Sequence, residues 1–130
     1  MVDALRAAHQ RVRPGGLVID ARPDASRHPR IVARGRVRAY LRQCEDAEER
    51  DRRADAAVVR VVERGLFQRG ETGRVWHGSR FADLAELDDY VNDSARYCDY
   101  ERGTRRALIP FKRGPLTMRR AIKFEVLARI

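Results

Sequence analysis

The sequence is poor in the residues from which metal sites, disulfides and membrane spans are built. Its two cysteines, Cys44 and Cys98, belong to no C-x-x-C pair and no Cys/His cluster. We therefore expect reduced thiols rather than a disulfide or a metal site. No apolar run approaches the roughly 18 residues of a membrane span, and the N-terminus lacks the basic and apolar regions of a signal peptide. These absences predict a cytoplasmic protein.

Lysine is also scarce. Only Lys112 and Lys123 are lysines, so 26 of the 28 basic residues are arginines, and the net charge is +9. A skew spread over the whole chain is typical of GC-rich codon usage. The alternative is a phosphate-binding surface, because arginine binds phosphate bidentately and a high basic charge is typical of nucleic-acid-binding proteins. In segment 45–53 acidic residues alternate with arginines, which predicts intrahelical ion pairs rather than a metal site.

The composition is that of a globular protein. Hydrophobic residues make up 43% and charged residues 36% of the 130 residues, which argues against disorder. A chain of this length fits one domain, and we expect residues 1–130 to form it. Folding at this size buries roughly two-thirds of the surface that the unfolded chain exposes. The sequence has no internal repeat and no linker-like segment.

The spacing of apolar residues predicts three helices and one weaker helix. The first covers 2–12 and ends before an Arg-Pro-Gly-Gly turn. The second covers 45–64, and only its second half has an apolar face, so that half is expected to pack on a core. The third covers 83–92 and begins with an Asp-Leu-Ala-Glu capping box. Segment 93–107, charged and aromatic, predicts a weak helix that ends near Gly103.

Five segments have the patterns of strands. Leu17–Arg22 is short, apolar and β-branched, which favours a strand buried on both faces. Segment 31–41 alternates and contains a glycine, which predicts a small two-stranded ribbon. A strand is expected to begin at 66–67, and glycines separate it from a further piece over 75–81. Segment 121–130 alternates so that one face of this last strand is wholly apolar.

Two segments give the chain a family resemblance. The run Ala4–Pro23, ALRAAHQRVRPGGLVIDARP, joins a helix, an RPGG turn and a strand. It resembles the middle of class I S-adenosylmethionine-dependent methyltransferases, where a helix ending in L-R-P-G-G leads into the fifth strand. Phe81–Tyr90, F-x-D-L-x-E-L-x-x-Y, is similar to a methyltransferase-like segment that packs beside the substrate side.

The resemblance implies a partial Rossmann-like fold of the α/β or α+β class. Leu17–Arg22 would be the fifth strand, Phe67–Phe81 the next strand and Ala121–Ile130 an antiparallel terminal strand. The sheet would be small and mixed, with about three to four helices. The chain would thus correspond to the C-terminal half of such an enzyme.

The family's cofactor-binding residues have no counterpart in this sequence. The family holds S-adenosylmethionine with a glycine-rich loop after its first strand and an acidic residue that ends its second. Here no G-x-G follows an apolar strand, and Arg13–Gly16 follows a helix. We therefore expect no cofactor in the isolated chain, and S-adenosylmethionine only if a separate N-terminal half supplies its site. We also expect the open edge of strand 17–22 to pair in a homodimer or with that half.

Five residues are candidates for a substrate-side site. Asp20, Arg22 and Asp24 follow the strand at the place where open α/β sheets bind ligands, and the resemblance implies that this loop faces substrate. The alternative is a solvated loop. Trp76 and His77 form a polar and aromatic cluster in which the histidine could act as a general base. The alternative there is a pair that caps the core.

Three functions remain open at this point. The first is a methyltransferase-like fragment or remnant, without independent catalysis, that acts as a half-enzyme or a dimeric interaction module. The second is a small basic α+β protein that binds nucleic acid through its arginines. The third is a ligand-binding protein with a pocket built on Trp76 and His77. No Ser-His-Asp, Cys-His, P-loop or zinc motif indicates another chemistry.

Overall fold

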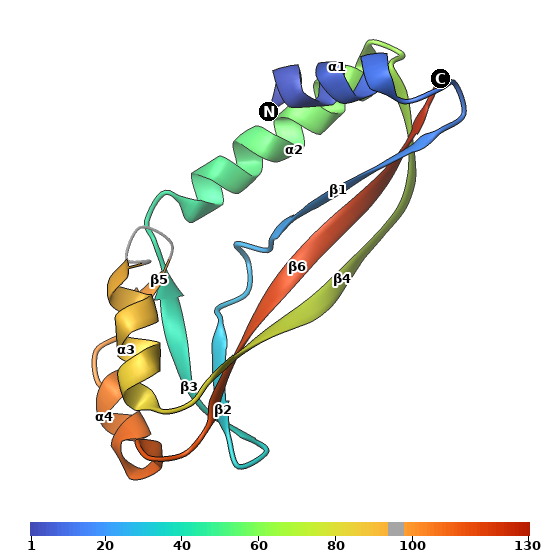
Figure 1. Ribbon diagram of the computed structural model, residues 1–130. Coiled ribbons are helices and arrows are strands. Elements are labelled where there is room, and N and C mark those ends of the chain that lie inside the picture. The colour runs from blue at the N-terminus through green and yellow to red at the C-terminus, as the bar shows by residue number, and fades with distance from the viewer. Residues whose placement is uncertain (94–97) are drawn as a thin grey trace. The chain divides into compact units, whose positions relative to one another are not determined.

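The fold is α+β with antiparallel strand pairing (Figure 1). A computed structural model of the chain describes residues 1–93 and 98–130. Its helices are α1 (Val2–Arg11), α2 (Ala47–Glu63), α3 (Leu84–Asp93), α4 (Thr104–Leu108) and the 3-10 helix η1 (Ile109–Phe111). Its strands are β1 (Leu17–Pro23), β2 (Arg30–Ala33), β3 (Arg36–Gln43), β4 (Phe67–Phe81), β5 (Cys98–Tyr100) and β6 (Leu116–Arg129). The predicted fold class is confirmed at this level, together with the antiparallel C-terminal strand.

The chain folds into two compact units. Unit 1 comprises residues 1–23, 48–75 and 122–130, and unit 2 comprises 24–47 and 76–121. Strands β4 and β6 each contribute residues to both units. The expectation of a single domain over residues 1–130 stays a prediction.

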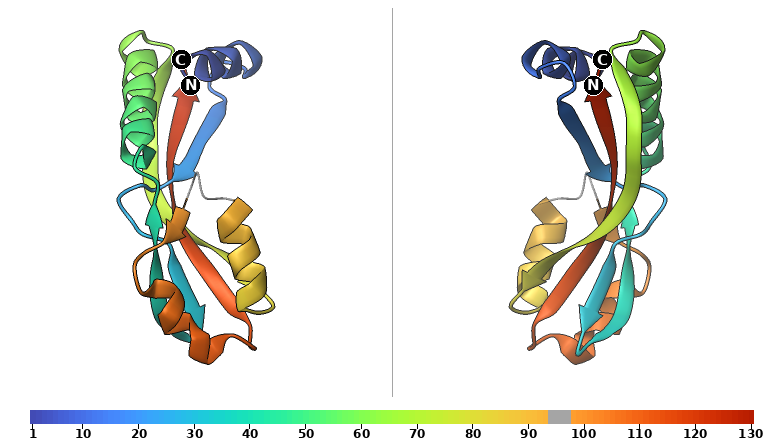
Figure 2. Two further views of the ribbon diagram at one scale, coloured as in Figure 1. Left: turned by 90° about the vertical axis from the view of Figure 1, so that its left-hand side faces the viewer. Right: turned by 90° about the vertical axis from the view of Figure 1, so that its right-hand side faces the viewer.

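Unit 1 is a three-stranded sheet with two helices on one side. β6 lies between β1 and β4 (Figure 2). β1 pairs antiparallel with β6, from Leu17 opposite Ala128 to Pro23 opposite Ile122. β4 pairs with β6 on its other side. Gly70 lies against Val126 and Gly73 against Phe124, so β4 also runs antiparallel to β6. β1 and β4 therefore run in the same direction, joined through α2, while α1 and α2 cover one face of the sheet (Figure 1).

The core of unit 1 lies between these helices and the sheet. It is formed by the buried side chains of Leu5, Val58, Val61, Phe67 and Leu127. The first helix turns into β1 through the RPGG segment, and α2 ends at Glu63, shortly before Gly65, whose φ is 69°. There the Gly65 and Leu66 amides donate to the carbonyls of Val62 and Val61, at 2.9 and 3.0 Å. This is the arrangement of a glycine C-terminal cap.

Unit 2 has its core on one face of the β2 and β3 ribbon. Arg34 and Gly35, with φ of 50° and 71°, make the two-residue turn between these strands. β2 also pairs with the first half of β6, and β3 pairs with β5. Helices α3 and α4 lie on one side of the ribbon (Figure 1). The large buried side chains there are Ile31, Leu41, Phe81, Leu84, Leu87, Val91, Leu108, Leu116 and Met118.

The helices and the ribbon follow the sequence predictions closely. The segments 2–12, 45–64 and 83–92 correspond to α1, α2 and α3. The capping box is formed: the Glu86 amide donates to Asp83 Oδ1 at 2.9 Å, and the Ala82 amide donates to Glu86 Oε2. In the first half of α2, Arg53 pairs with Glu49 one turn away. None of the described helices is both long and apolar enough to cross a bilayer.

The prediction that β1 is buried on both faces is wrong. Its residues alternate between half-buried and exposed, and Leu17 and Ile19 are 63% and 66% exposed. The physical reason is that both helices of unit 1 cover the same face of the strand. Neither α1 nor α2 lies on the opposite face, although its residues are apolar.

The predicted break in β4 is also wrong. Phe67–Phe81 is one continuous strand, and its glycines allow β6 to approach instead of ending the strand. A Cβ on Gly73 would lie 2.7 Å from Phe124 Cζ, so a larger residue would press on the ring. Glycine in a strand commonly marks such a close approach rather than a turn.

Two further segments differ from the expectations. β6 begins at Leu116, and its residues Glu125 and Leu127 are buried while the apolar face of 122–128 is only half-buried. The predicted weak helix over 93–107 is wrong where Cys98–Tyr100 pairs with β3 as a strand and α4 begins after Gly103. Pairing with a distant strand overrides local helix propensity here. The part of that prediction over 94–97 lies outside the described residues.

Candidate functional site

Two of the predicted site residues lie in a polar network between β1 and α2 in unit 1. Strand alternation places Asp20 and Arg22 on the face of β1 that the helices cover. Their partners across the sheet are Glu125 and Lys123 on β6. Four charged side chains thus occupy neighbouring positions of two strands, on the helix-covered side.

Arg22 is the centre of this network. Its guanidinium contacts three carboxylates: Asp20 at 3.0 Å, Asp51 at 3.3 Å and Asp55 at 2.8 Å. The side chains of Arg22 and Asp20 are only 16% and 10% exposed. The Arg22 contact with Asp20 is an ion pair without the geometry of a hydrogen bond.

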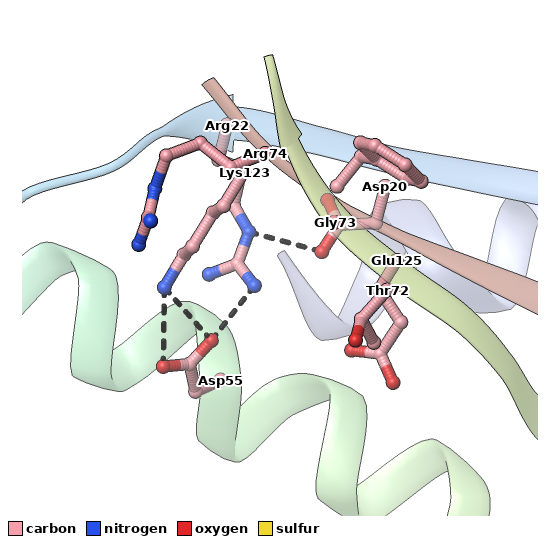
Figure 3. A pocket seen from close by; sticks show the side chains of 9 residues that line it. Asp20, Arg22, Asp55, Thr72, Gly73, Arg74, Lys123 and Glu125 are labelled. Atoms are coloured by element: carbon pink, nitrogen blue, oxygen red, sulfur yellow. Dashed lines mark hydrogen bonds and ion pairs between the residues drawn. The ribbon is translucent and has the colours of Figure 1, made fainter. Parts of the chain in front are cut away.

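Lys123 completes the network from the adjacent strand. Its ammonium lies 2.6 Å from Asp51 Oδ1 and 3.3 Å from Asp55 Oδ1. Asp51 and Asp55 are four residues apart, so both project from the same side of α2. Figure 3 shows Arg22 and Lys123 pointing together at Asp55. Two cations from the sheet and two carboxylates from the helix therefore hold α2 against β1 and β6.

The cations keep Asp55 ionised. Burial raises the pKa of this carboxyl, but the hydrogen bond from Arg22 and the charge of Lys123 together outweigh burial, so its pKa lies below the ordinary value. Nearby, the buried carboxylate of Glu125 is 2.6 Å from Arg69 Nε. The network thus consists of acidic and basic groups placed in contact with one another.

A pocket of about 350 Å³ opens beside the network. It is lined by Asp20, Arg22, Asp55, Thr72, Gly73, Arg74, Lys123, Phe124 and Glu125. A charged ligand would have to compete with the existing ion pairs. We conclude that the network positions α2 against the sheet.

Asp24 belongs to unit 2, where its side chain lies in its own loop and is 4% exposed. Its Oδ1 accepts hydrogen bonds from the Ser26 amide at 3.0 Å and the Ser26 hydroxyl at 2.6 Å. This is the local turn that aspartate commonly stabilises. The residue thus has a structural role in the turn after β1.

Trp76 and His77 do not share a pocket. They are adjacent on β4, so their side chains leave opposite faces of the strand. Trp76 is 40% exposed and lies under the Arg30 guanidinium, 4.1 Å from the ring centroid. His77 is exposed on the other face. Neither side chain is buried deeply enough to cap the core.

Asp51, Asp55 and Lys123 belong to the network but were missed by the sequence reasoning. The sequence signal for the two aspartates is their spacing of four residues on a helix with an apolar face. The neighbouring arginines make this spacing hard to recognise. Lys123 gives no local signal, since its role depends on being opposite Arg22 across the sheet. Among the described residues, no cluster of histidine, cysteine and carboxylate side chains has the arrangement of a metal site.

The amides of the two glycines in the RPGG turn are hydrogen-bonded within the protein. The Gly15 amide donates to the Arg129 carbonyl at 2.9 Å, and the Gly16 amide donates to the Arg13 carbonyl at 2.8 Å. A Cβ on Gly16 would lie 2.5 Å from the Val12 side chain. These glycines therefore serve the packing of α1 onto the sheet, and their amides are not available to a cofactor.

Cys44 and Cys98 are not joined by a disulfide. Burial raises the pKa of the Cys98 thiol, an effect that the nearby Arg120 only partly offsets. A buried thiol with a raised pKa is unreactive.

Comparisons with known proteins assign no family to this chain. A fold alone identifies no function, since one architecture supports many activities. The function must therefore be inferred from its residues and surfaces. No family model matches the sequence, and no curated protein or solved structure matches it either.

Proposed function

We propose that the chain is a cytoplasmic, methyltransferase-like C-terminal half without catalysis of its own. In this proposal unit 1 docks through β1 onto a complementary α/β half, and that half supplies the S-adenosylmethionine site. The chain's contribution is structural: it completes the sheet and covers one side of it. The proposal does not require any group of the Arg22 network to react.

The observation that supports this proposal most is the free edge and bare face of β1. β1 ends the strand order, and β6 is its partner strand in the described part of the chain. On its uncovered face, Leu17 and Ile19 lie opposite Ala128 and Val126, so the apolar surface continues onto β6. An exposed edge strand with an apolar face is a site for pairing with another chain.

The free energy gained by covering this face would come mainly from burying two side chains. Leu17 and Ile19 are each about two-thirds exposed. Full burial of such a side chain contributes about 1.5–3 kcal/mol, so burying what remains of each contributes roughly 1–2 kcal/mol. Hydrogen bonds along the free edge would add direction and register.

The topology supports the family resemblance. β1 is followed by the β2 and β3 ribbon, then α2 and β4, and β1 and β4 both run antiparallel to the final strand. The resemblance implies this order of fifth strand, helix, next strand and antiparallel terminal strand. It also implies further strands beyond the fifth, and the free edge of β1 is where they would add. The bare face would then receive the helices of the complementary half.

Calorimetric titration of the pure chain with S-adenosylmethionine is the first test. The expected result is no binding, because the amides of Gly15 and Gly16 are already hydrogen-bonded to backbone carbonyls. Stoichiometric binding at micromolar concentration would contradict the proposal. The chain co-expressed with a glycine-rich half should instead form a one-to-one complex that binds the cofactor.

The variant Ile19→Arg tests the docking face. Light scattering should show that it no longer forms the complex, because the arginine would be buried against an apolar surface. Val59→Arg is the matched control, since Val59 is an exposed valine, at 38%, on α2. It should leave the complex unchanged. A particle of twice the 15.0 kDa chain mass that Ile19→Arg dissociates would show instead that a second copy covers β1.

A further inference from the structure

Four side chains form a row across the strands of unit 2. Arg30 on β2 lies opposite Arg119 on β6 and opposite Tyr40 on β3. On the far side of β6 is β4, where Gly78 lies against Thr117 and Trp76 lies under the Arg30 guanidinium. The resulting order is aromatic, arginine, arginine, aromatic.

This row lies on the face of the sheet opposite the core of unit 2. The sequence neighbours Ile31, Ala39 and Met118 are buried in that core, so alternation directs the row the other way. α3 and α4 lie on the core side (Figure 1). Tyr40 and Trp76 are 49% and 40% exposed. Two aromatic rings are therefore accessible beside arginine side chains.

Arginines gather in four strand segments of unit 2. The segments 30–33, 36–43, 76–81 and 116–121 contain no acidic residue and seven arginines: Arg30, Arg36, Arg38, Arg42, Arg80, Arg119 and Arg120. Among the other elements of unit 2, α3 contains four acidic residues and no basic one, β5 contains Asp99, and α4 contains Arg105 and Arg106. The four strand segments are therefore basic without acidic residues of their own.

Not every arginine of these strands is available to a ligand. Arg38 donates to the Ala33 carbonyl at 3.0 Å and stacks on Phe111, 4.4 Å from the ring centroid. Arg42 is 3.9 Å from Asp99 in an exposed pair. Arg80 and Arg119 are exposed, and alternation places them on the same face as Trp76. The face therefore presents Arg80 and Arg119 together with Arg30, whose guanidinium also stacks on one side of the Trp76 ring, and Arg42 lies at its edge.

We propose that this face of unit 2 binds single-stranded nucleic acid. Exposed aromatic rings on an open sheet stack unpaired bases, and arginines between them contact the phosphates. Four neighbouring strands span roughly 14 Å at the usual strand spacing, which accommodates one base on Tyr40 and another on Trp76. A duplex keeps its bases stacked on one another, so it cannot use the two rings. The proposal depends on unit 2 residues alone and is independent of the function proposed for unit 1.

The single tryptophan provides a direct readout of binding at this face. Twelve-nucleotide single strands of RNA and of DNA, with the same sequence, are titrated into the chain while Trp76 fluorescence is followed. Stacking should quench the emission, and the matching duplex should quench it much less. With three to four arginine–phosphate contacts, log K should fall with log salt with a slope of about −2 to −3. The RNA and DNA titrations show which single strand is preferred.

Paired charge variants separate this face from the general basic charge. Arg30→Gln with Arg119→Gln should weaken binding at least tenfold and reduce the salt slope by about 1.4. Arg11→Gln with Arg64→Gln changes the charge equally at two exposed positions in unit 1 and should change affinity less than twofold. Tyr40→Leu keeps the charge and should cost about 5- to 100-fold, the usual loss for one stacked base. Circular dichroism melts confirm that each variant is folded.

Three results would overturn this proposal. One is equal weakening by the two charge-variant pairs, which would make the binding unspecific. Another is binding of a labelled strand, seen by anisotropy, without any change in Trp76 fluorescence. The third is equal affinity for duplex and single strand, since a duplex offers no unpaired base to either ring.

Discussion

The sheet faces that the helices leave uncovered differ in chemical character between the two units. In each, helices cover one face of a small antiparallel sheet and leave the other face bare. The bare face of unit 1 is apolar, with Leu17 and Ile19 exposed. The bare face of unit 2 has Tyr40 and Trp76 among arginines. An apolar face is stabilised by another protein surface, whereas an aromatic and cationic face suits a charged, stackable ligand.

The ion-pair networks of the two units differ in their exposure to solvent. Unit 1 holds α2 with a mostly buried network around Arg22, whose side chain is 16% exposed. Unit 2 has an exposed counterpart, in which Asp88 accepts from Tyr100 at 2.6 Å and from Arg105 at 2.9 Å. The Arg105 side chain is 52% exposed. Solvent screens the second network far more than the first, and the comparison predicts different costs for breaking each.

The largest effect is expected from Arg22→Met. This change leaves Asp20 and Asp51 in a mostly buried site with fewer positive partners. Breaking a buried pair costs about 3–5 kcal/mol, and because Lys123 remains we expect about 2–3 kcal/mol of lost unfolding free energy. Urea denaturation measures it. Arg105→Met is the control and should leave the urea midpoint nearly unchanged; equal losses for the two variants would remove the distinction between the networks.

An intermediate effect is expected where β4 approaches β6. Gly73→Ala places a Cβ 2.7 Å from Phe124 Cζ, so the ring must move, and we expect a loss of about 1–2 kcal/mol. Gly78→Ala, on the same strand in unit 2, meets Thr117 at an ordinary 3.5 Å. It should stabilise the protein by up to about 1 kcal/mol, because alanine restricts the unfolded chain more than glycine does. Thermal unfolding of both variants measures the difference, and the same sign for both would show that strand propensity rather than packing decides.

The smallest effect is expected from acid. Burial raises the pKa of Asp55, but Arg22 and Lys123 hold it below its ordinary 3.8. A hydrogen bond from Arg105 lowers the pKa of Asp88 against a smaller effect of burial. For a lowered folded pKa, the stabilisation is complete above the unfolded value and is lost as pH falls through the folded one. Stability should therefore decline only below about pH 4.

The variants Asp55→Asn and Asp88→Asn assign this decline to the two units. Each should be less stable than the parent at pH 6, and the deficit should shrink as the pH falls through the lowered pKa of the parent carboxyl. Urea midpoints measured from pH 6 downward follow this change. A deficit that stays constant with pH would mean that shape, not charge, is what the aspartate contributes.

Elements that depend on residues close together in the sequence could be predicted from it. The capping box of α3 needs only Asp83 and Glu86, three residues apart, and the structure forms it. The β2 and β3 ribbon follows from alternation and Gly35, whose positive φ makes the turn. The end of α2 follows from Gly65 for the same reason. In each case the residues that interact lie within one turn or one hairpin.

Elements that depend on contacts between residues far apart in the sequence could not be predicted. The glycines of β4 have the same local signature as a break, and only the approach of Phe124 to Gly73 shows that they permit pairing. Cys98–Tyr100 is a strand because β3 pairs with it. Only part of the candidate network could be predicted from the sequence. Asp20 and Arg22 were predicted together, but their partners on α2 were not.

The sequence by itself determined the helices, the ribbon and the apolar character of Leu17–Arg22, because periodicity and capping act within a few residues. Only the tertiary structure decided which faces are covered. α1 and α2 lie on one side of β1, so the apolar residues Leu17 and Ile19 are exposed and the charged Asp20 and Arg22 are enclosed. Arg30, Tyr40, Trp76 and Arg119 are likewise scattered in sequence and meet only because four strands align. Sequence patterns assign residues to faces, but packing alone determines which face meets water.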